Sequence, residues 1–316
     1  MAPGTPLPVT LKILVSIAVL AWITHGMDVG AVQATLAAVD WIYIGAAVAL
    51  LAALTALQAW RWGLVMTALG APVHSLERLI NCFIGQFFNQ TLPSTVGGDA
   101  VRIVLLRKTL PLRIAANGVL IDRLCALFAL LLMGLAGLPW LAQLESSSNA
   151  IVTVGVALLC GFAGMFTLLF ADRLPQRIRA NRVGMAMSSL SIDARKAMLN
   201  AHPGPLVLLT SVVVHTHVSG IIWLIALGLD LPVTLGQALV LVPLVMIVSA
   251  IPISVAGWGV REGAMVAALG LVGTPAEGAF AVSILFGLTL VLVGLPGGAL
   301  WLGNRGGGAQ PAAAVD

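Results

Sequence analysis

Long apolar stretches recur along the chain and are separated by short polar segments. A helix needs about 20 mostly apolar residues to cross a bilayer, so each uninterrupted stretch predicts one membrane-spanning helix. Six stretches meet this requirement: 11–27, 41–60, 115–138, 150–171, 206–229 and 279–303. The pattern therefore predicts an all-α polytopic membrane protein with about six full spans.

Two further apolar stretches are interrupted by helix-breaking residues. Residues 79–108 contain Pro93 followed by a Gly-Gly pair, and residues 235–272 contain Pro252 followed by two separate glycines. Proline removes a backbone donor and glycine weakens a helix, so neither stretch is expected to run straight through the membrane. We expect each to form a re-entrant broken-helix hairpin that returns to the side from which it entered.

The order of these elements predicts two similar halves. Residues 41–138 and residues 206–303 each read as span, hairpin, span, with hairpins that enter from opposite sides. Paired interrupted segments in inverted halves are typical of transporters whose site lies near the bilayer midplane. We therefore predict an inverted repeat within one transmembrane domain, 1–305, with a cytoplasmic linker at 172–205 and a disordered tail at 306–316.

The basic residues orient this arrangement. If the amino terminus is cytoplasmic, fourteen Lys and Arg residues fall in inside segments and none falls in an outside loop. Basic residues concentrate on the cytoplasmic side of membrane proteins. We expect both termini and the 172–205 linker, which reads as partly amphipathic helix, to be cytoplasmic.

Composition excludes several classes of protein. Only 9% of the 316 residues are charged and 59% are hydrophobic, with a mean hydropathy of +1.05. A soluble domain carries about 25% charged residues, so a secreted domain, a cytosolic enzyme and a disordered chain are excluded. The net charge of +4 does not indicate nucleic acid, because the basic residues lie in blocks between spans. The three cysteines are widely spaced and predict neither disulfides nor a metal site.

Ionisable residues inside apolar stretches are the strongest candidates for function, since an unpaired charge in hydrocarbon costs several kcal/mol. Three acid–base couples stand out, namely Asp99 with Arg102, Asp122 with Arg123, and Arg261 with Glu262. The first couple is three residues apart, which is pairing distance on a helix that restarts at Gly98.

Glycines precede two of these arginines, Gly97 and Gly98 before Arg102, and Gly257 and Gly259 before Arg261. Free N–H groups at a helix start attract anions, so each site could hold a phosphate headgroup. In the alternative reading, the glycines permit tight turns and the charges pair with each other.

Other polar residues of these stretches leave two readings open or predict no chemistry. Asn89, Gln86 and Thr91 either satisfy backbone groups freed by Pro93 or line a polar path. His215 and His217 point in different directions on one helix and cannot chelate one metal as an i, i+4 pair does. We expect no metal and no cofactor.

Three ordered motifs resemble the lysylphosphatidylglycerol synthase transmembrane-region family, the flippase-like domain of bacterial MprF proteins. They are Phe88-Asn89-x-x-Leu92-Pro93-x-x-x-Gly97-Gly98-Asp99-x-x-Arg102, Asp122-Arg123-Leu124, and Pro252-Ile253-Ser254-x-x-Gly257-x-Gly259-x-Arg261-Glu262. The resemblance covers roughly residues 10–305. It implies a bacterial inner-membrane protein that moves a lipid or lipid-linked headgroup between leaflets.

The resemblance leaves the lipid open, because relatives serve aminoacylated phosphatidylglycerol, polyprenyl-linked and hopanoid-linked compounds. Full-length relatives add a soluble aminoacyl-transfer domain that this sequence lacks, so we expect a transporter rather than an enzyme. The alternatives are a membrane-embedded lipid-headgroup transferase and a non-catalytic subunit of a lipid-modifying complex. Expected partners are a membrane lipid and, for the latter, an oligomer or a separate lipid-modifying enzyme. The predicted substrate-binding residues are Asn89, Pro93, Gly97, Gly98, Asp99, Arg102, Asp122, Arg123, Ser254, Gly257, Gly259, Arg261 and Glu262.

Overall fold

The computed structural model describes residues 9–92, 96–144 and 148–306, and the regular elements in these ranges are all helices. The prediction of an all-α protein is therefore confirmed. In chain order the helices are α1 (Val9–His25), α2 (Val29–Ala37), α3 (Trp41–Ala68), α4 (Ser75–Thr91), α5 (Gly97–Leu106), α6 (Leu112–Leu144), α7 (Ser148–Leu169), a 3-10 helix (Ala171–Arg173), α8 (Gln176–Arg179), α9 (Arg182–Met198), α10 (Gly204–Gly228), α11 (Leu235–Ser249), α12 (Val260–Gly270) and α13 (Ala276–Gly306).

The long apolar helices coincide with the predicted spans. Helices α3, α6, α7, α10 and α13 are each long and apolar enough to cross a membrane, and α1 reaches that length only together with α2. Helices α1 and α2 meet at a bend of 94°. Residues 28–40, between the first two predicted spans, are therefore not a plain loop, because they contain α2, whose start Asp28 caps by accepting from Gly30 N–H.

Helix α3 runs to Ala68, past the expected end at residue 60. It consequently carries Arg61 and Trp62 into the interior, where both side chains are buried. Three of the basic residues assigned to cytoplasmic segments, Lys12, Arg61 and Arg102, are in fact buried among helices. Burial places these three side chains in the interior of the protein.

Both interrupted apolar stretches form pairs of shorter helices. Helix α4 packs against α5 across a break at 92–96, and α11 packs against α12 across a break at 250–259. The two helices of each pair therefore pack against each other as the two arms of a hairpin, whereas the two parts of one straight span would follow each other end to end. Pro93, at the first break, lies outside the described residues.

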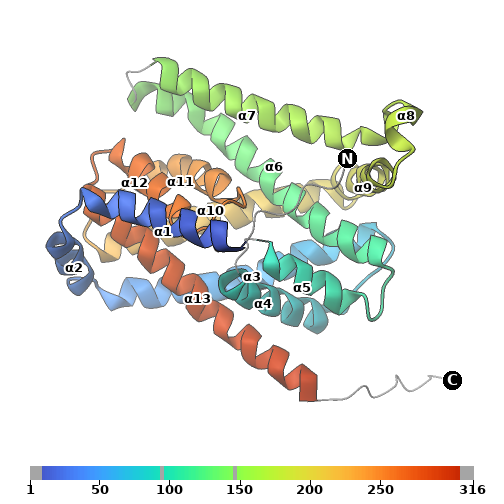
Figure 1. Cartoon of the computed structure of the whole chain (residues 1–316), viewed down its shortest axis with the longest axis horizontal. Coiled ribbons are helices and arrows are strands. Elements are labelled where there is room, and N and C mark those ends of the chain that lie inside the picture. The colour runs from blue at the N-terminus through green and yellow to red at the C-terminus, as the bar shows by residue number, and fades with distance from the viewer. Residues whose placement is uncertain (1–8, 93–95, 145–147, 307–316) are drawn as a thin grey trace.

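The two halves have equivalent neighbours. The helices of the two halves correspond as α3 to α10, α4 to α11, α5 to α12 and α6 to α13. Whenever two of these eight helices pack against each other, their two counterparts also pack against each other. Helices α3 and α10 pack on each other at the centre, α4 packs on α13, and α11 packs on α6. Figure 1 shows α7 along the outer side of α6, away from this central group.

The turns after α3 and α10 are also equivalent, 160 residues apart. Leu69-Gly70-Ala71-Pro72-Val73 corresponds to Leu229-Asp230-Leu231-Pro232-Val233. Gly70 and Asp230 both adopt left-handed backbone, with φ of 71° and 53°. In both turns the following residue donates its N–H to the carbonyl oxygen five residues earlier, Ala71 to Met66 and Leu231 to Ala226. These shared features support the predicted repeat, while its inverted orientation in a membrane stays a prediction.

The 172–205 linker contains α8 and α9 and is fastened to the bundle by charged side chains. Arg195 donates to Asp172 at 2.6 Å and, with Ser191, holds the pKa of that carboxyl well below its ordinary value. Asp193 accepts from Arg113 and Asn117 of α6 at 2.9 and 2.7 Å. Helix α9 is thus a fixed part of the structure.

Candidate functional site

A network of charged side chains, all buried except the half-exposed Arg123, lies where α3, α5 and α6 meet. Asp122 accepts from Arg61 at 2.9 Å, and Arg123 grips Asp99 with two hydrogen bonds of 2.7 and 3.1 Å. The expected couple of Asp122 with Arg123 is therefore wrong, because Asp122 pairs with Arg61 of α3 and Arg123 pairs with Asp99 of α5. Each of these two side chains reaches to a different helix.

Arg102 is the least satisfied member of this network. It approaches Asp99 and Asp122 at 3.5 and 3.6 Å, both longer than the other ion pairs of the cluster. Its Nε and Nη2 have no hydrogen-bond partner among the described residues, although the side chain is buried. The guanidinium lies over the ring of Trp62 at 4.3 Å, a stacking that holds it in place.

The first glycine pair allows the two helices of the hairpin to approach closely, and the N–H of its second glycine is occupied. The N–H of Gly98 donates to the side chain of Asn89 at 2.9 Å. A Cβ at Gly98 would lie 1.9 Å from the carbonyl oxygen of Gly85, and one at Gly97 would lie 2.7 Å from Leu92. The expectation that Gly98 offers its N–H to an anion is therefore wrong, and Asn89 satisfies a backbone donor.

Arg102 opens onto a cavity of about 150 Å³. Polar side chains dominate its wall, which comprises Gln58, Arg61, Cys82, Gly85, Gln86, Asn89, Arg102, Asp122, Arg123, Ala126, Val214 and His215. Four of the predicted site residues, Asn89, Arg102, Asp122 and Arg123, are thus brought together around one space.

The second broken motif builds a tighter ion pair. Arg261 donates to Glu262 at 2.7 Å, and Ser283 of α13 donates to the same carboxylate at 3.0 Å. Glu262 also accepts from the N–H of Gly259, which closes a capping box at the start of α12. The Gly259 donor is consequently occupied, as is that of Gly98.

Gly259 and Ser254 serve packing and do not line a cavity. Gly259 has a φ of 89°, which favours glycine, and a Cβ there would lie 3.0 Å from the carbonyl oxygen of Ser16 in α1. Ser254 is fully buried, and its hydroxyl has no hydrogen-bond partner among the described residues. Ser16 accepts from the N–H of Val255 at 2.9 Å, so α1 covers this break.

Arg261 and Gly257 line a second cavity of about 240 Å³. The guanidinium of Arg261 lies near the rings of Trp258 and Phe286, at 4.8 and 5.8 Å. Four residues belong to the walls of both cavities: Gln58, Gln86, Arg123 and His215. The two cavities therefore adjoin, and the two broken motifs face a common polar interior.

Sequence reasoning missed several of these residues. Arg61 and Trp62 lie beyond residue 60, where the predicted span ends. Ser283 and Gln58 lie in apolar stretches and belong to no motif. One signal was present in the sequence, because Pro-x-Ser/Thr-Val-x-Gly-x-x-Val-Arg occurs in both hairpins and ends at Arg102 and at Arg261. This shared motif makes the two arginines equivalent positions of the two halves.

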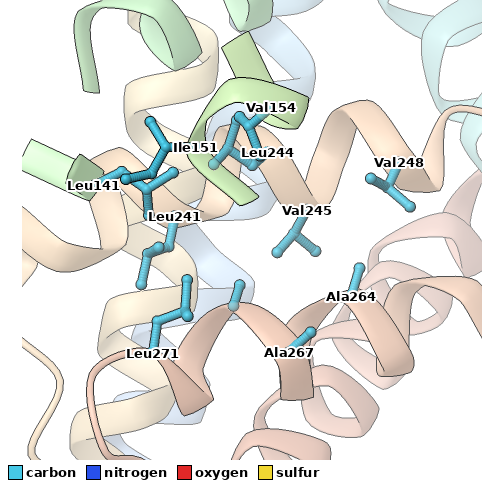
Figure 2. Close-up of a pocket in the computed structure, with 11 residues that line it drawn as sticks. Leu141, Ile151, Val154, Leu241, Leu244, Val245, Val248, Ala264, Ala267 and Leu271 are labelled. Carbon is cyan, nitrogen blue, oxygen red and sulfur yellow. The ribbon is translucent and has the colours of Figure 1, made fainter. Parts of the chain in front are cut away.

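An apolar groove of about 360 Å³ lies between α11 and α12 and is closed by the facing ends of α6 and α7. Figure 2 shows that its walls are aliphatic side chains, including Leu241, Val245, Val248 and Ala264. On α12, Ala264 comes one turn after Arg261, so the groove follows the same hairpin that presents this arginine.

Most of the sequence matches one known protein family. No curated protein matches the sequence. The family model of the lysylphosphatidylglycerol synthase TM region matches residues 9–298, a range that includes both hairpins and the charged network. The chain is therefore a multi-pass membrane protein related to lipids, and it belongs to the lysylphosphatidylglycerol synthase transmembrane-region family.

Proposed function

We propose that this protein is a translocase that moves a phospholipid or lipid-linked headgroup between the leaflets of the bacterial inner membrane. The observation that carries the proposal is the pair of adjoining cavities, each lined by the buried arginine of one broken hairpin. Buried charges inside a membrane bundle mark substrate pathways, and arginine matches the geometry of phosphate. A headgroup would pass through the polar interior from one arginine to the other.

The apolar groove along α11 and α12 gives this proposal a place for the lipid tail. Its aliphatic walls resemble the hydrocarbon of the bilayer, so an acyl chain loses little by entering it. The headgroup can then occupy the polar cavities while the tail stays in an apolar environment.

Arg261 provides the test of this function. Arg261→Lys should lower leaflet transfer of a fluorescent phosphatidylglycerol in proteoliposomes by about tenfold, because lysine cannot form two parallel bonds to phosphate. Arg261→Ala should lower it further, since it also removes the cation that neutralises Glu262.

The paired replacement Arg261→Gln with Glu262→Met separates binding from structural pairing. It removes both charges together and leaves no uncompensated carboxylate, so the protein should insert and remain monodisperse. If this pair transfers lipid at the wild-type rate, Arg261 acts only as a structural partner and the translocase site is placed wrongly.

We also propose that both termini and the linker at 172–205 face the cytoplasm. Single cysteines at Glu277 and at Arg179, each in a background without the native cysteines, test this with a membrane-impermeant thiol reagent. In intact cells the reagent should label the cysteine that replaces Glu277, near the start of α13. It should not label the cysteine that replaces Arg179, at the end of α8. Labelling at Arg179 in intact cells would reverse the orientation.

A further inference from the structure

We infer that the polar interior selects lipids with an anionic phosphate and an otherwise uncharged headgroup, and that it rejects headgroups carrying an amine cation. This inference rests on the proposed lipid transfer and specifies its substrate.

The charged side chains around the two cavities do not balance. Four guanidinium groups face three carboxylates, which leaves one positive charge; they are Arg61, Arg102, Arg123 and Arg261 against Asp99, Asp122 and Glu262. Six of these side chains are buried, whereas Arg123 is 48% exposed and neutralises the buried Asp99 from the edge of the group. One buried guanidinium is therefore left without a carboxylate of its own, and an uncompensated buried charge favours a ligand of opposite sign. One anionic group would make the site neutral.

The surplus charge can be assigned to Arg102. Asp99 is held at short distance by Arg123, and Asp122 by Arg61, so neither carboxylate depends on Arg102 for its neutralisation. The Nε and Nη2 of Arg102 lack partners among the described residues, and this residue lines the cavity. Two unused donors on one planar guanidinium suit two oxygens of one phosphate.

No carboxylate of this interior remains for a cation. Asp99 and Asp122 each accept from an arginine of another helix, and Glu262 accepts from Arg261, Ser283 and the N–H of Gly259. An amine cation, such as that of a lysyl ester, would enter a cavity that is already positive. The cost of burying this cation would not be repaid by an unpaired carboxylate.

The uncharged wall suits the rest of such a headgroup. Gln58 and Gln86 line both cavities and offer amide donors and acceptors, which can bind hydroxyl groups. These two residues also allow the charge of the interior to be changed without touching the ion pairs.

The purified full chain in a neutral detergent should bind dioctanoyl phosphatidylglycerol at least about tenfold more tightly than the lysyl ester of the same lipid, a difference of about 1.4 kcal/mol. Displacement of a fluorescent short-chain phosphatidylglycerol reports both affinities without requiring transfer. Gln58→Glu or Gln86→Glu removes the surplus charge and should reduce this preference to less than about threefold. Gln143→Glu makes the same change at an exposed position of α6 and should keep the wild-type preference.

Equal affinity for the two lipids, or tighter binding of the lysyl ester, would overturn the inference. If free glycerol phosphate displaces the probe as well as the lipid does, the site binds a soluble anion and the lipid assignment is wrong. Selective binding without any leaflet transfer in proteoliposomes would refute the proposed translocation and leave the charge selectivity standing.

Discussion

Arg102→Met should abolish most lipid transfer while leaving the folded protein at least as stable as the wild type. Each carboxylate near Arg102 keeps a closer arginine when this side chain is removed, so no buried charge loses its main partner. Arg102 also buries two guanidinium nitrogens without partners among the described residues, which is unfavourable, so an apolar side chain of similar length should not lower the free energy of unfolding. Transfer should nevertheless fall by at least about tenfold, because the two free guanidinium donors are lost.

Arg61→Met is the matched comparison, since it removes a guanidinium from the same network. Asp122 would then retain only the 3.6 Å contact with Arg102. Loss of the main partner of a buried charge costs about 3–5 kcal/mol, so this variant should unfold at a lower temperature. The temperature at which each variant loses its monodisperse peak on size-exclusion chromatography gives its thermal stability. Proteoliposomes give its rate of lipid transfer.

The two variants together distinguish a functional arginine from a structural one. If Arg102→Met is as unstable as Arg61→Met, Arg102 is a structural part of the network. If it is stable and transfers lipid normally, the free donors of Arg102 have no role in transport.

Gly98→Ala should prevent the first hairpin from closing. The added Cβ would lie 1.9 Å from the carbonyl oxygen of Gly85 and 2.7 Å from the side-chain oxygen of Asn89. The first of these atoms is backbone in the facing arm, so α4 and α5 would have to move apart. Such overpacking costs about 1–3 kcal/mol or more, and the yield of monodisperse protein should fall sharply.

Gly220→Ala is the control, because no atom lies within 4 Å of the added Cβ in α10. Alanine is the better helix former by about 1 kcal/mol, so this variant should be expressed as well as the wild type or better. Normal yield and normal thermal stability of Gly98→Ala would contradict the close approach of the two arms.

Apolar length was sufficient to predict the long helices, because hydrocarbon imposes a minimum length on a span. It could not predict where α3 ends, since Arg61 and Trp62 look like interfacial residues in a sequence. They are buried because α3 continues beneath Arg102, a tertiary contact that no local pattern contains. The same limit explains α2, whose nine residues are too few to be recognised as a span.

The pairing of the charged residues was predicted in part. Asp99 lies near Arg102 and Glu262 pairs with Arg261, as expected, whereas Asp122 and Arg123 do not pair with each other. Helical spacing makes Asp122 and Arg123 neighbours in sequence but directs them to different helices, so their partners depend on the packing of α3 and α5. The glycines were expected to expose their N–H groups. Instead, Asn89 and Glu262 occupy the donors of Gly98 and Gly259.

Photo-crosslinking from inside the cavity tests most directly whether a lipid headgroup enters it. A benzophenone side chain replaces Gln58, which lines both cavities, in cells whose phospholipids carry radioactive phosphate. A second benzophenone replaces the exposed Val156 on α7 as a control for contact with bulk lipid. We expect a radioactive adduct from both positions, with the adduct from position 58 lost in Arg102→Met and the adduct from position 156 retained. An adduct from position 156 alone in the otherwise wild-type protein would contradict the entry of a lipid headgroup between the two hairpins.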